Sequence, residues 1–204
     1  MKNLKLVLVT AVLAIFASCS DNENIEELIN LQTKTVNNLY APAEGRGNYT
    51  GDFTKFSFHT GATVEGDNWD IAFRATEIIV NGGEKGKLLE DIDRTGEASL
   101  SIIPNTTFND VTEAPSDETF KQDRVEALAL PVGSSNGWYN YNPTNHGINP
   151  IAGVVLVVKT IEGNYAKMEI TTYYKDGDAT NPENGRHYTF NYQLNPEKGK
   201  KKFQ

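Results

Sequence analysis

The chain of 204 residues is long enough for one domain with a substantial hydrophobic core. It has 19 Lys and Arg against 27 Asp and Glu, and this acidic balance argues against nucleic acid or anionic lipid as a partner. It has one cysteine, so no disulfide can form within the chain and the core must hold the fold.

Residues 1–18 have the pattern of a secretion signal. Lys2 and Lys5 precede an apolar run over 6–16, which is too short to span a bilayer, and two small residues then lead to Cys19. This arrangement resembles a lipobox, so we expect cleavage before Cys19 and lipidation of its thiol. The alternative is an ordinary signal followed by a chance cysteine.

Residues 19–33 form an acidic stretch that predicts a solvated tether. Its start, 20–23, also resembles the acidic signal that directs some lipoproteins to the outer face of the outer membrane. No second long apolar segment follows, so the lipid would be the only attachment to the membrane. We therefore expect a lipid-anchored protein of the outer membrane, at the cell surface.

From residue 34 onward the chain shows strand patterns. Large apolar residues recur at every second position, as in half-buried strands, and one continuous β-branched run predicts a strand buried on both faces. The segments are 56–58, 69–74, 77–80, 153–159, 166–171 and 188–194, separated by turn-forming residues. These patterns predict one all-β domain over 34–204. They place Trp69, Ile71 and Phe73 on one buried face, and Met168 in the core.

Three segments imitate functional motifs. Residues 133–137 match the G-x-S-x-G nucleophile pattern, but 138–143 cannot easily open the helix that this motif requires. Residues 91–96 imitate a calcium loop whose twelfth position is Ile102 rather than glutamate, and 176–183 is a second acidic stretch. We expect all three to be solvated surface turns. Since no paired carboxylates, triad or metal cluster is evident, we expect a binding protein rather than an enzyme.

The three histidines differ in their surroundings. His187 alternates with the apolar face of the last strand and should point to solvent, while His59 should lie in a loop at the end of a strand. His146 lies within 138–150, which we interpret as an aromatic loop. Apolar walls with few polar groups are typical of small-molecule sites, and a neutral imidazole there could bind a metal or haem iron. The alternative is an aromatic loop that packs on the end of the domain without a ligand.

The chain resembles the HmuY family of outer-membrane haem-binding lipoproteins of Gram-negative bacteria. The resemblance rests on three blocks of sequence and covers most of the mature chain. The blocks are 68–74 with 78–83, then 137–150 with 155–160, and finally 162–170 with 173–174 and 188–192.

The resemblance implies an all-β fold, lipid anchoring, and capture of haem for transfer to a TonB-dependent outer-membrane receptor. Members hold the iron from both sides with two histidines or two methionines. His146 falls near the downstream ligand position, but the stretch 108–137, where the upstream ligand should lie, has neither residue type. Lys121, Tyr139 and Tyr141 are the candidates for a second ligand. The alternative is a related lipoprotein that binds another tetrapyrrole or a protein partner.

Overall fold

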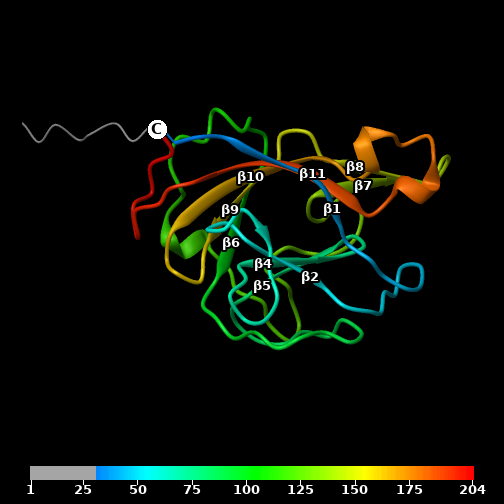
Figure 1. The fold of residues 1–204 in the computed structure, drawn as a ribbon, viewed down its shortest axis with the longest axis horizontal. Helices are drawn as coiled ribbons and strands as arrows, with labels where there is room; N and C mark the ends of the chain where they lie inside the picture. Colours follow the sequence, from blue (N-terminus) through cyan, green and yellow to red (C-terminus); the bar gives the residue numbers. More distant parts are fainter. Residues whose placement is uncertain (1–30) are drawn as a thin grey trace, which may run out of the picture.

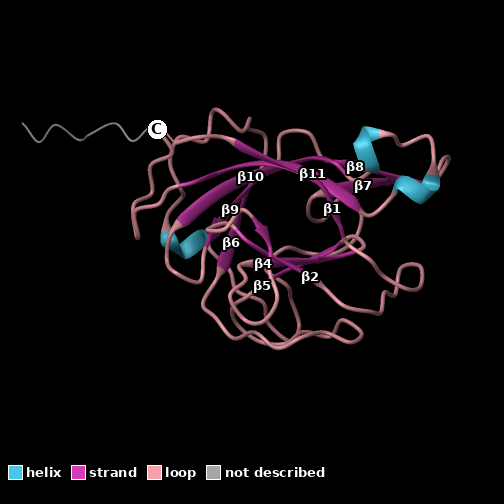
Figure 2. Cartoon of the chain, in the orientation of Figure 1, coloured by secondary structure: helices cyan, strands magenta, loops and turns pink. Residues whose placement is uncertain are grey.

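The computed structural model describes residues 31–204, so the predicted signal, Cys19 and most of the predicted tether lie outside the described residues. The prediction of an all-β fold of antiparallel sheets is confirmed (Figure 1). Three short 3-10 helices are the helical elements of the described part, as Figure 2 shows. The elements are β1 (Lys34–Tyr40), β2 (Thr54–Ser57), β3 (Ala62–Thr63), β4 (Ile71–Arg74), β5 (Glu77–Val80), β6 (Ser99–Ile103), η1 (Asp117–Thr119), β7 (Tyr139–Asn142), β8 (Gly147–Pro150), β9 (Val155–Lys159), β10 (Tyr165–Thr172), η2 (Lys175–Gly177), η3 (Pro182–Asn184) and β11 (His187–Leu194).

The larger sheet has five strands in the order β1-β11-β10-β9-β6. All its neighbours are antiparallel. In β9, residues 155–158 are all buried, as the continuous apolar run predicts. In β11 the buried positions alternate, whereas residues 165–168 of β10 are all buried, and Met168 is fully buried at the centre of β10.

The smaller sheet has four strands in the order β3-β2-β4-β5. It packs against the larger sheet through aromatic side chains. The ring of Phe190 on β11 meets Phe56 edge-on at 5.3 Å and stacks on Phe73 at 5.8 Å between ring centroids. Each such pair contributes about 0.5–1.5 kcal/mol to stability, beyond the contribution of the apolar area that it buries. The core between the sheets is therefore built largely from aromatic side chains.

Trp69 is buried as predicted, but its predicted face is wrong. It precedes β4 and packs with Phe53, Ala72 and Ile79 on the outer face of the smaller sheet. Ile71 and Phe73 face the larger sheet. The alternation counted from Trp69 fails because the strand begins only at Ile71.

Lys167 is also an exception to the alternation, because its side chain is buried instead of solvated. Its Nζ donates hydrogen bonds to the carbonyl oxygens of Phe108 and Val111, at 2.7 and 2.8 Å. The ammonium lies 4.4 Å from the centre of the Phe108 ring. Burial lowers the pKa of the Lys167 amine. The cation thus holds the loop that follows β6 against the outer face of the larger sheet.

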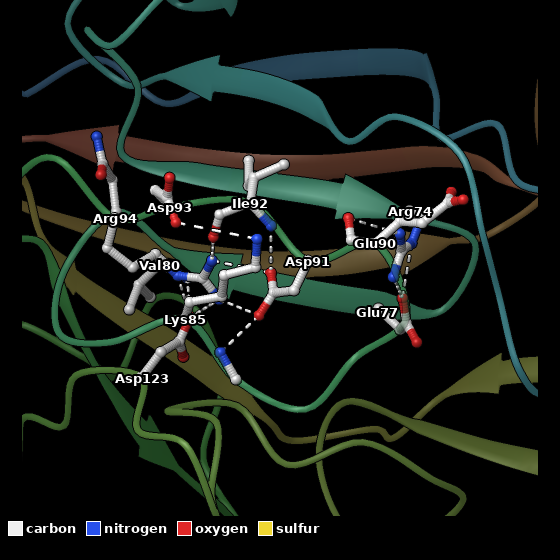
Figure 3. A network of polar contacts seen from close by, with 12 residues as sticks. Arg74, Glu77, Val80, Lys85, Glu90, Asp91, Ile92, Asp93, Arg94 and Asp123 are labelled. Atoms are coloured by element: carbon white, nitrogen blue, oxygen red, sulfur yellow. Dashed lines mark hydrogen bonds and ion pairs between the residues drawn. The ribbon is translucent and has the colours of Figure 1, made fainter.

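The segment that imitates a calcium loop is not a solvated turn. Asp91 is buried, and the fully buried guanidinium of Arg94 lies between the carboxylates of Asp91 and Asp123 (Figure 3). A second buried pair, Arg74 with Glu77 at 2.8 Å, joins the ends of β4 and β5. These residues fix two long loops to the smaller sheet, and the sequence pattern gave no sign of this.

Candidate ligand site at the β7–β8 hairpin

The segment 138–150 is a β-hairpin rather than the predicted loop. Strands β7 and β8 pair antiparallel, with Tyr139 opposite Pro150 and Tyr141 opposite Ile148. These four side chains share one face of the hairpin, because opposed residues and alternate residues point the same way. The hairpin lies at one end of the molecule, beside η2 (Figure 1).

The base of the hairpin is fixed in the core by Trp138. Its indole Nε1 donates to the carbonyl oxygen of Thr76 at 3.0 Å, and its ring packs on Tyr173 and Tyr188 at 5.6 and 5.0 Å. On the other strand, the Ile148 amide donates to the hydroxyl oxygen of Tyr174 at 2.8 Å. Both strands are therefore tied to the ends of β10 and β11, and the hairpin's tip is held in a defined place.

Tyr141 and His146 meet at the tip of the hairpin. Both side chains are exposed, Tyr141 by 41%, and the Tyr141 hydroxyl forms a short hydrogen bond with Nδ1 of His146. The ring centroids lie 6.0 Å apart. His146 has a left-handed backbone with φ of 57°, a conformation in which Asn, Asp and His are enriched among residues other than glycine. It stands at the end of the loop that joins the strands, and its ring turns back to Tyr141.

The loop at the tip is braced by side-chain hydrogen bonds to its own backbone. Oδ1 of Asn142 accepts from the Thr144 amide at 2.9 Å, and Oδ1 of Asn145 accepts from the Gly147 amide at 3.0 Å. Such Asx bonds favour tight turns. The bonds flank His146 on its amino-terminal side and at the residue that follows it. These two bonds restrict the backbone of the short turn that carries the imidazole of His146.

The G-x-S-x-G segment braces β7 from outside. Oγ of Ser134 accepts from the Tyr141 amide at 2.8 Å, and Oγ of Ser135 donates to Oδ1 of Asn140 at 2.8 Å. The segment is an exposed turn followed by a strand rather than a helix, as expected from its sequence. These serines position β7, a role that their sequence pattern does not indicate. The alternation of Tyr139 and Tyr141 with Ile148 and Pro150 around a short Asn-rich turn is the signal that could have revealed the hairpin.

Tyr139 and Lys121, two other residues predicted near the ligand, lie elsewhere. Tyr139 is only 8% exposed and packs on Trp138 at 4.9 Å between ring centroids. Lys121 is exposed and pairs its backbone with Leu100 on the edge of β6. The structure therefore brings Tyr141 and His146 together, with Tyr139 in the core beneath them.

The other histidines have separate surroundings. His187 is half-buried, against the expectation that it points to solvent, and its ring stacks on Tyr40 at 4.7 Å. Its Nδ1 lies 2.9 Å from the carbonyl oxygen of Gly185. His59 is exposed in a turn, as expected, and its Nδ1 lies 3.5 Å from a carboxylate oxygen of Glu162.

Two cavities open elsewhere on the molecule. The larger, of about 1300 Å³, runs along the edge of β6 and is lined by Lys121, Phe120 and Ile161 among others. The smaller, of about 520 Å³, contains His59 and the buried Asp70. Neither is lined by residues of the β7–β8 hairpin. Within residues 31–204, no group of three or more His, Cys, Asp or Glu can hold a metal ion, and no helix is long and apolar enough to cross a membrane.

Comparison with solved structures finds proteins that are similar to this chain. The apo form of PinO from Porphyromonas gingivitis aligns with a TM-score of 0.51 and 14% identity, over 80% of this chain and 97% of that chain. The apo HmuY analogue of Tannerella forsythia aligns with a TM-score of 0.43 and 21% identity, over 82% and 96%. A Bacteroides vulgatus protein described as HmuY-like and haem-binding aligns with a TM-score of 0.42 and 16% identity, over 80% and 91%.

No curated protein sequence matches the chain. The model of the HmuY protein family matches residues 48–192, which include the smaller sheet, the β7–β8 hairpin and most of the larger sheet, without β1. Because this match covers well over half of the sequence, the chain belongs to the HmuY family.

Proposed function

We propose that this protein binds haem at the tip of the β7–β8 hairpin. The observation that supports this most directly is the contact between the exposed side chains of Tyr141 and His146 in a chain of the HmuY family. Imidazole and phenol oxygen both serve as axial ligands of haem iron in proteins. The site has one pair of such donors and therefore holds the iron from one side.

The chemistry of the hairpin fits a porphyrin as well as its iron. Tyr141 and the half-buried Ile148 share the face that continues from the core toward the tip. An aromatic ring and an aliphatic side chain offer apolar contact to a flat macrocycle, while the polar atoms at the tip meet the metal. Tyr139 lies on the same face but is buried against Trp138, so it anchors the base of the hairpin rather than contacting the haem.

We further propose that the haem is held at the cell surface and passed to a TonB-dependent outer-membrane receptor. A lipid on Cys19 would attach the protein to the outer membrane, with the tether over 19–33 between membrane and domain. An exposed site with ligation from one side suits transfer, because the open side of the haem remains accessible to an acceptor. We expect no enzymatic role and no role in binding nucleic acid.

Haemin titration tests the proposed site. The mature chain with Cys19→Ala, which has no lipidation site, is titrated with haemin and the Soret band is followed. We expect a saturable shift that is lost in the double variant Tyr141→Ala/His146→Ala and kept in the control His59→Ala. Equal binding by the double variant would move the site away from the hairpin, and no binding by the unaltered domain would refute haem as the ligand.

The alternative is a ligand other than haem, and the larger cavity is the observation that favours it. Its lining has no histidine, methionine or tyrosine, and Lys121 is its one residue named above as a candidate iron ligand, so a ligand there would be bound mainly by contacts other than iron coordination. Titration with iron-free protoporphyrin IX separates the two sites. A ligand of the hairpin requires iron, whereas a tetrapyrrole in the cavity would bind with or without the metal.

A further inference from the structure

We propose that the smaller cavity binds an organic cation that has two or more ammonium groups on an aliphatic chain. The cavity has a volume of about 520 Å³, within the range of small-molecule sites. Its lining has three carboxylates, from Glu65, Asp70 and Glu162, and neither Lys nor Arg. No residue of the β7–β8 hairpin lines it, so this site is separate from the proposed haem site and goes beyond the proposed function.

Asp70 is the buried acid of this cavity, with 2% of its surface exposed. Among residues 31–204 it differs from the other buried carboxylates, because each of those contacts an arginine and Asp70 contacts no Lys or Arg side chain. The paired carboxylates are those of Glu77, Asp91 and Asp123. Burying a carboxylate without a cation is unfavourable. The cavity therefore has an uncompensated negative charge within reach of a cationic ligand.

The Asp70 carboxylate is held in place and can still accept further hydrogen bonds. One oxygen accepts from the Phe58 amide at 2.8 Å, and the other accepts from the Ile161 amide at 2.9 Å. An ionised carboxylate has about four lone-pair sites, so two remain. Burial raises the pKa of Asp70, and the charge of Glu162 raises it further. An ammonium group beside Asp70 would offset both effects and donate to the remaining lone pairs.

Ser57 is a second buried polar group of the cavity, and it is independent of the charge. It is only 6% exposed and lines the cavity, and within the described chain its hydroxyl forms no hydrogen bond. The hydroxyl oxygen is therefore available to accept from an ammonium group. Val64, Ile161 and Leu194 also line the cavity and offer apolar contact to the methylene groups of an aliphatic amine.

The other two carboxylates suit a second ammonium group. Glu65 and Glu162 are exposed, and Nδ1 of His59 lies 3.5 Å from a carboxylate oxygen of Glu162. A chain with an ammonium group at each end can therefore meet both the buried and the exposed carboxylates. A metal ion fits less well, because no group of three or more His, Cys, Asp or Glu in residues 31–204 can hold one.

Calorimetric titration of the Cys19→Ala mature chain with cadaverine, a five-carbon diamine, tests the site. We expect saturable binding with a dissociation constant of about 1 mM or tighter. Pentylamine lacks the second ammonium group and should bind about threefold more weakly or worse, and the uncharged pentanediol should not bind. Ser57→Ala should weaken cadaverine binding by about two- to tenfold, because one hydrogen bond is lost. No binding of cadaverine, or equal binding of cadaverine and pentanediol, would overturn the proposal.

Charge variants test whether the carboxylates of the cavity are responsible. Glu65→Gln/Glu162→Gln should weaken cadaverine binding by about fivefold or more. Glu44→Gln/Glu183→Gln is the matched control, because it changes the net charge equally at exposed residues outside the cavity, and its affinity should stay within about twofold. Equal weakening in the two double variants would show that only the net charge of the protein attracts the amine.

NMR spectroscopy tests the position of the amine directly. The amide signals of Phe58 and Ile161 should shift when cadaverine is added, because both amides donate to the Asp70 carboxylate. The hairpin variant Tyr141→Ala/His146→Ala should bind cadaverine as the unaltered chain does, so the result does not depend on haem binding. Unchanged signals of the two amides, or loss of cadaverine binding in the hairpin variant, would overturn the assignment of the amine to this cavity.

Discussion

Nη2 of Arg94 lies 2.8 Å from Oδ2 of Asp123, and both side chains are completely buried. The same guanidinium also meets Asp91 at 2.9 Å, and Asp123 accepts hydrogen bonds from the amides of Val80 and Ala129. As Figure 3 shows, the contacts of Arg94 with the two carboxylates link the segment after β5 to the loop that contains Asp123. One cation thus neutralises carboxylates from two loops that are distant in the sequence.

Replacing Arg94 with Met should destabilise the domain strongly. The substitution leaves Asp91 and Asp123 buried without their cation, and breaking a buried pair in this way costs about 3–5 kcal/mol. Urea unfolding followed by tryptophan fluorescence would give the change in free energy of unfolding. Lys87→Met, which breaks an exposed pair with Glu126, is the matched control and should change the free energy by less than about 1 kcal/mol. Equal effects of the two substitutions would show that the buried network adds nothing special.

Trp69→Ala should also destabilise the domain, by about 3–5 kcal/mol, because it removes a large side chain that is only 1% exposed. The loss falls on the outer face of the smaller sheet, where Trp69 packs on Phe53 and Ile79. Trp138 remains as the fluorescence probe for the unfolding curve. Trp69→Phe keeps part of the volume and should cost clearly less. A melting temperature for Trp69→Ala within error of the unaltered domain would contradict this packing.

The strands were predictable wherever burial follows a local period. β11 alternates in sequence as it does in burial, because one of its faces meets the core throughout, whereas β10 follows its sequence pattern only from Met168 onward. The predicted face of Trp69 is wrong because that face depends on where β4 begins. Alternation shows which residues share a face within a strand, but it does not show at which residue the strand begins. The interpretation of Asp91 as solvated failed for another reason. Its partner Arg94 is three residues away, but the buried site also includes Asp123, which tertiary structure brings near and no local pattern reports.

The residues of the candidate site could be predicted from the sequence, but their arrangement in space could not. His146 and Tyr141 were both singled out from residues 138–150, and the structure places them in contact. The sequence pattern does not predict the hairpin, because its two strands are short and are joined by a turn of four residues. Each strand therefore has too few alternating apolar positions to be recognised as a strand. The hydrogen bond from the Tyr141 amide to Ser134 could not be predicted, because Ser134 lies in a separate turn whose sequence imitates a nucleophile motif.

The lipid anchor remains a prediction, because Cys19 lies outside the described residues. Cys19→Ala should release the protein from membranes, since no other acylation site or membrane-spanning segment is expected in the mature chain. Fractionation of cells expressing the unaltered and substituted chains, with metabolic labelling by a fatty acid analogue, would measure this. Asn24→Ala, which lies outside the cleavage motif and outside 20–23, serves as a neighbouring control that leaves the thiol in place. Retention of the label after Cys19→Ala would place the lipid on another residue.

Asp70 should give the stability of the domain a distinctive pH dependence. Its buried carboxylate accepts from the amides of Phe58 and Ile161, at 2.8 and 2.9 Å, and so joins the two sheets. Burial raises its pKa above the ordinary 3.8, with a smaller contribution from the charge of Glu162. The folded state then holds the proton more tightly than the unfolded state. This contribution to stability therefore grows as the pH falls through the raised pKa toward 3.8, and is lost as the pH rises.

Asp70→Asn isolates this contribution, because asparagine does not titrate. At neutral pH the variant should be less stable by about 1–3 kcal/mol, since its amide offers one acceptor oxygen to two backbone N–H groups. The difference in free energy of unfolding between the unaltered protein and the variant should widen as the pH falls, in urea unfolding measured at a series of pH values.

Asp178→Asn is the control, for which the pH dependence has the opposite sign. Hydrogen bonds from Thr180 lower the pKa of Asp178, so that group stabilises above 3.8 and its contribution is lost as the pH falls. A difference for Asp70→Asn that stays constant, or narrows as it does for Asp178→Asn, would show that burial does not favour the protonated form of this carboxyl group.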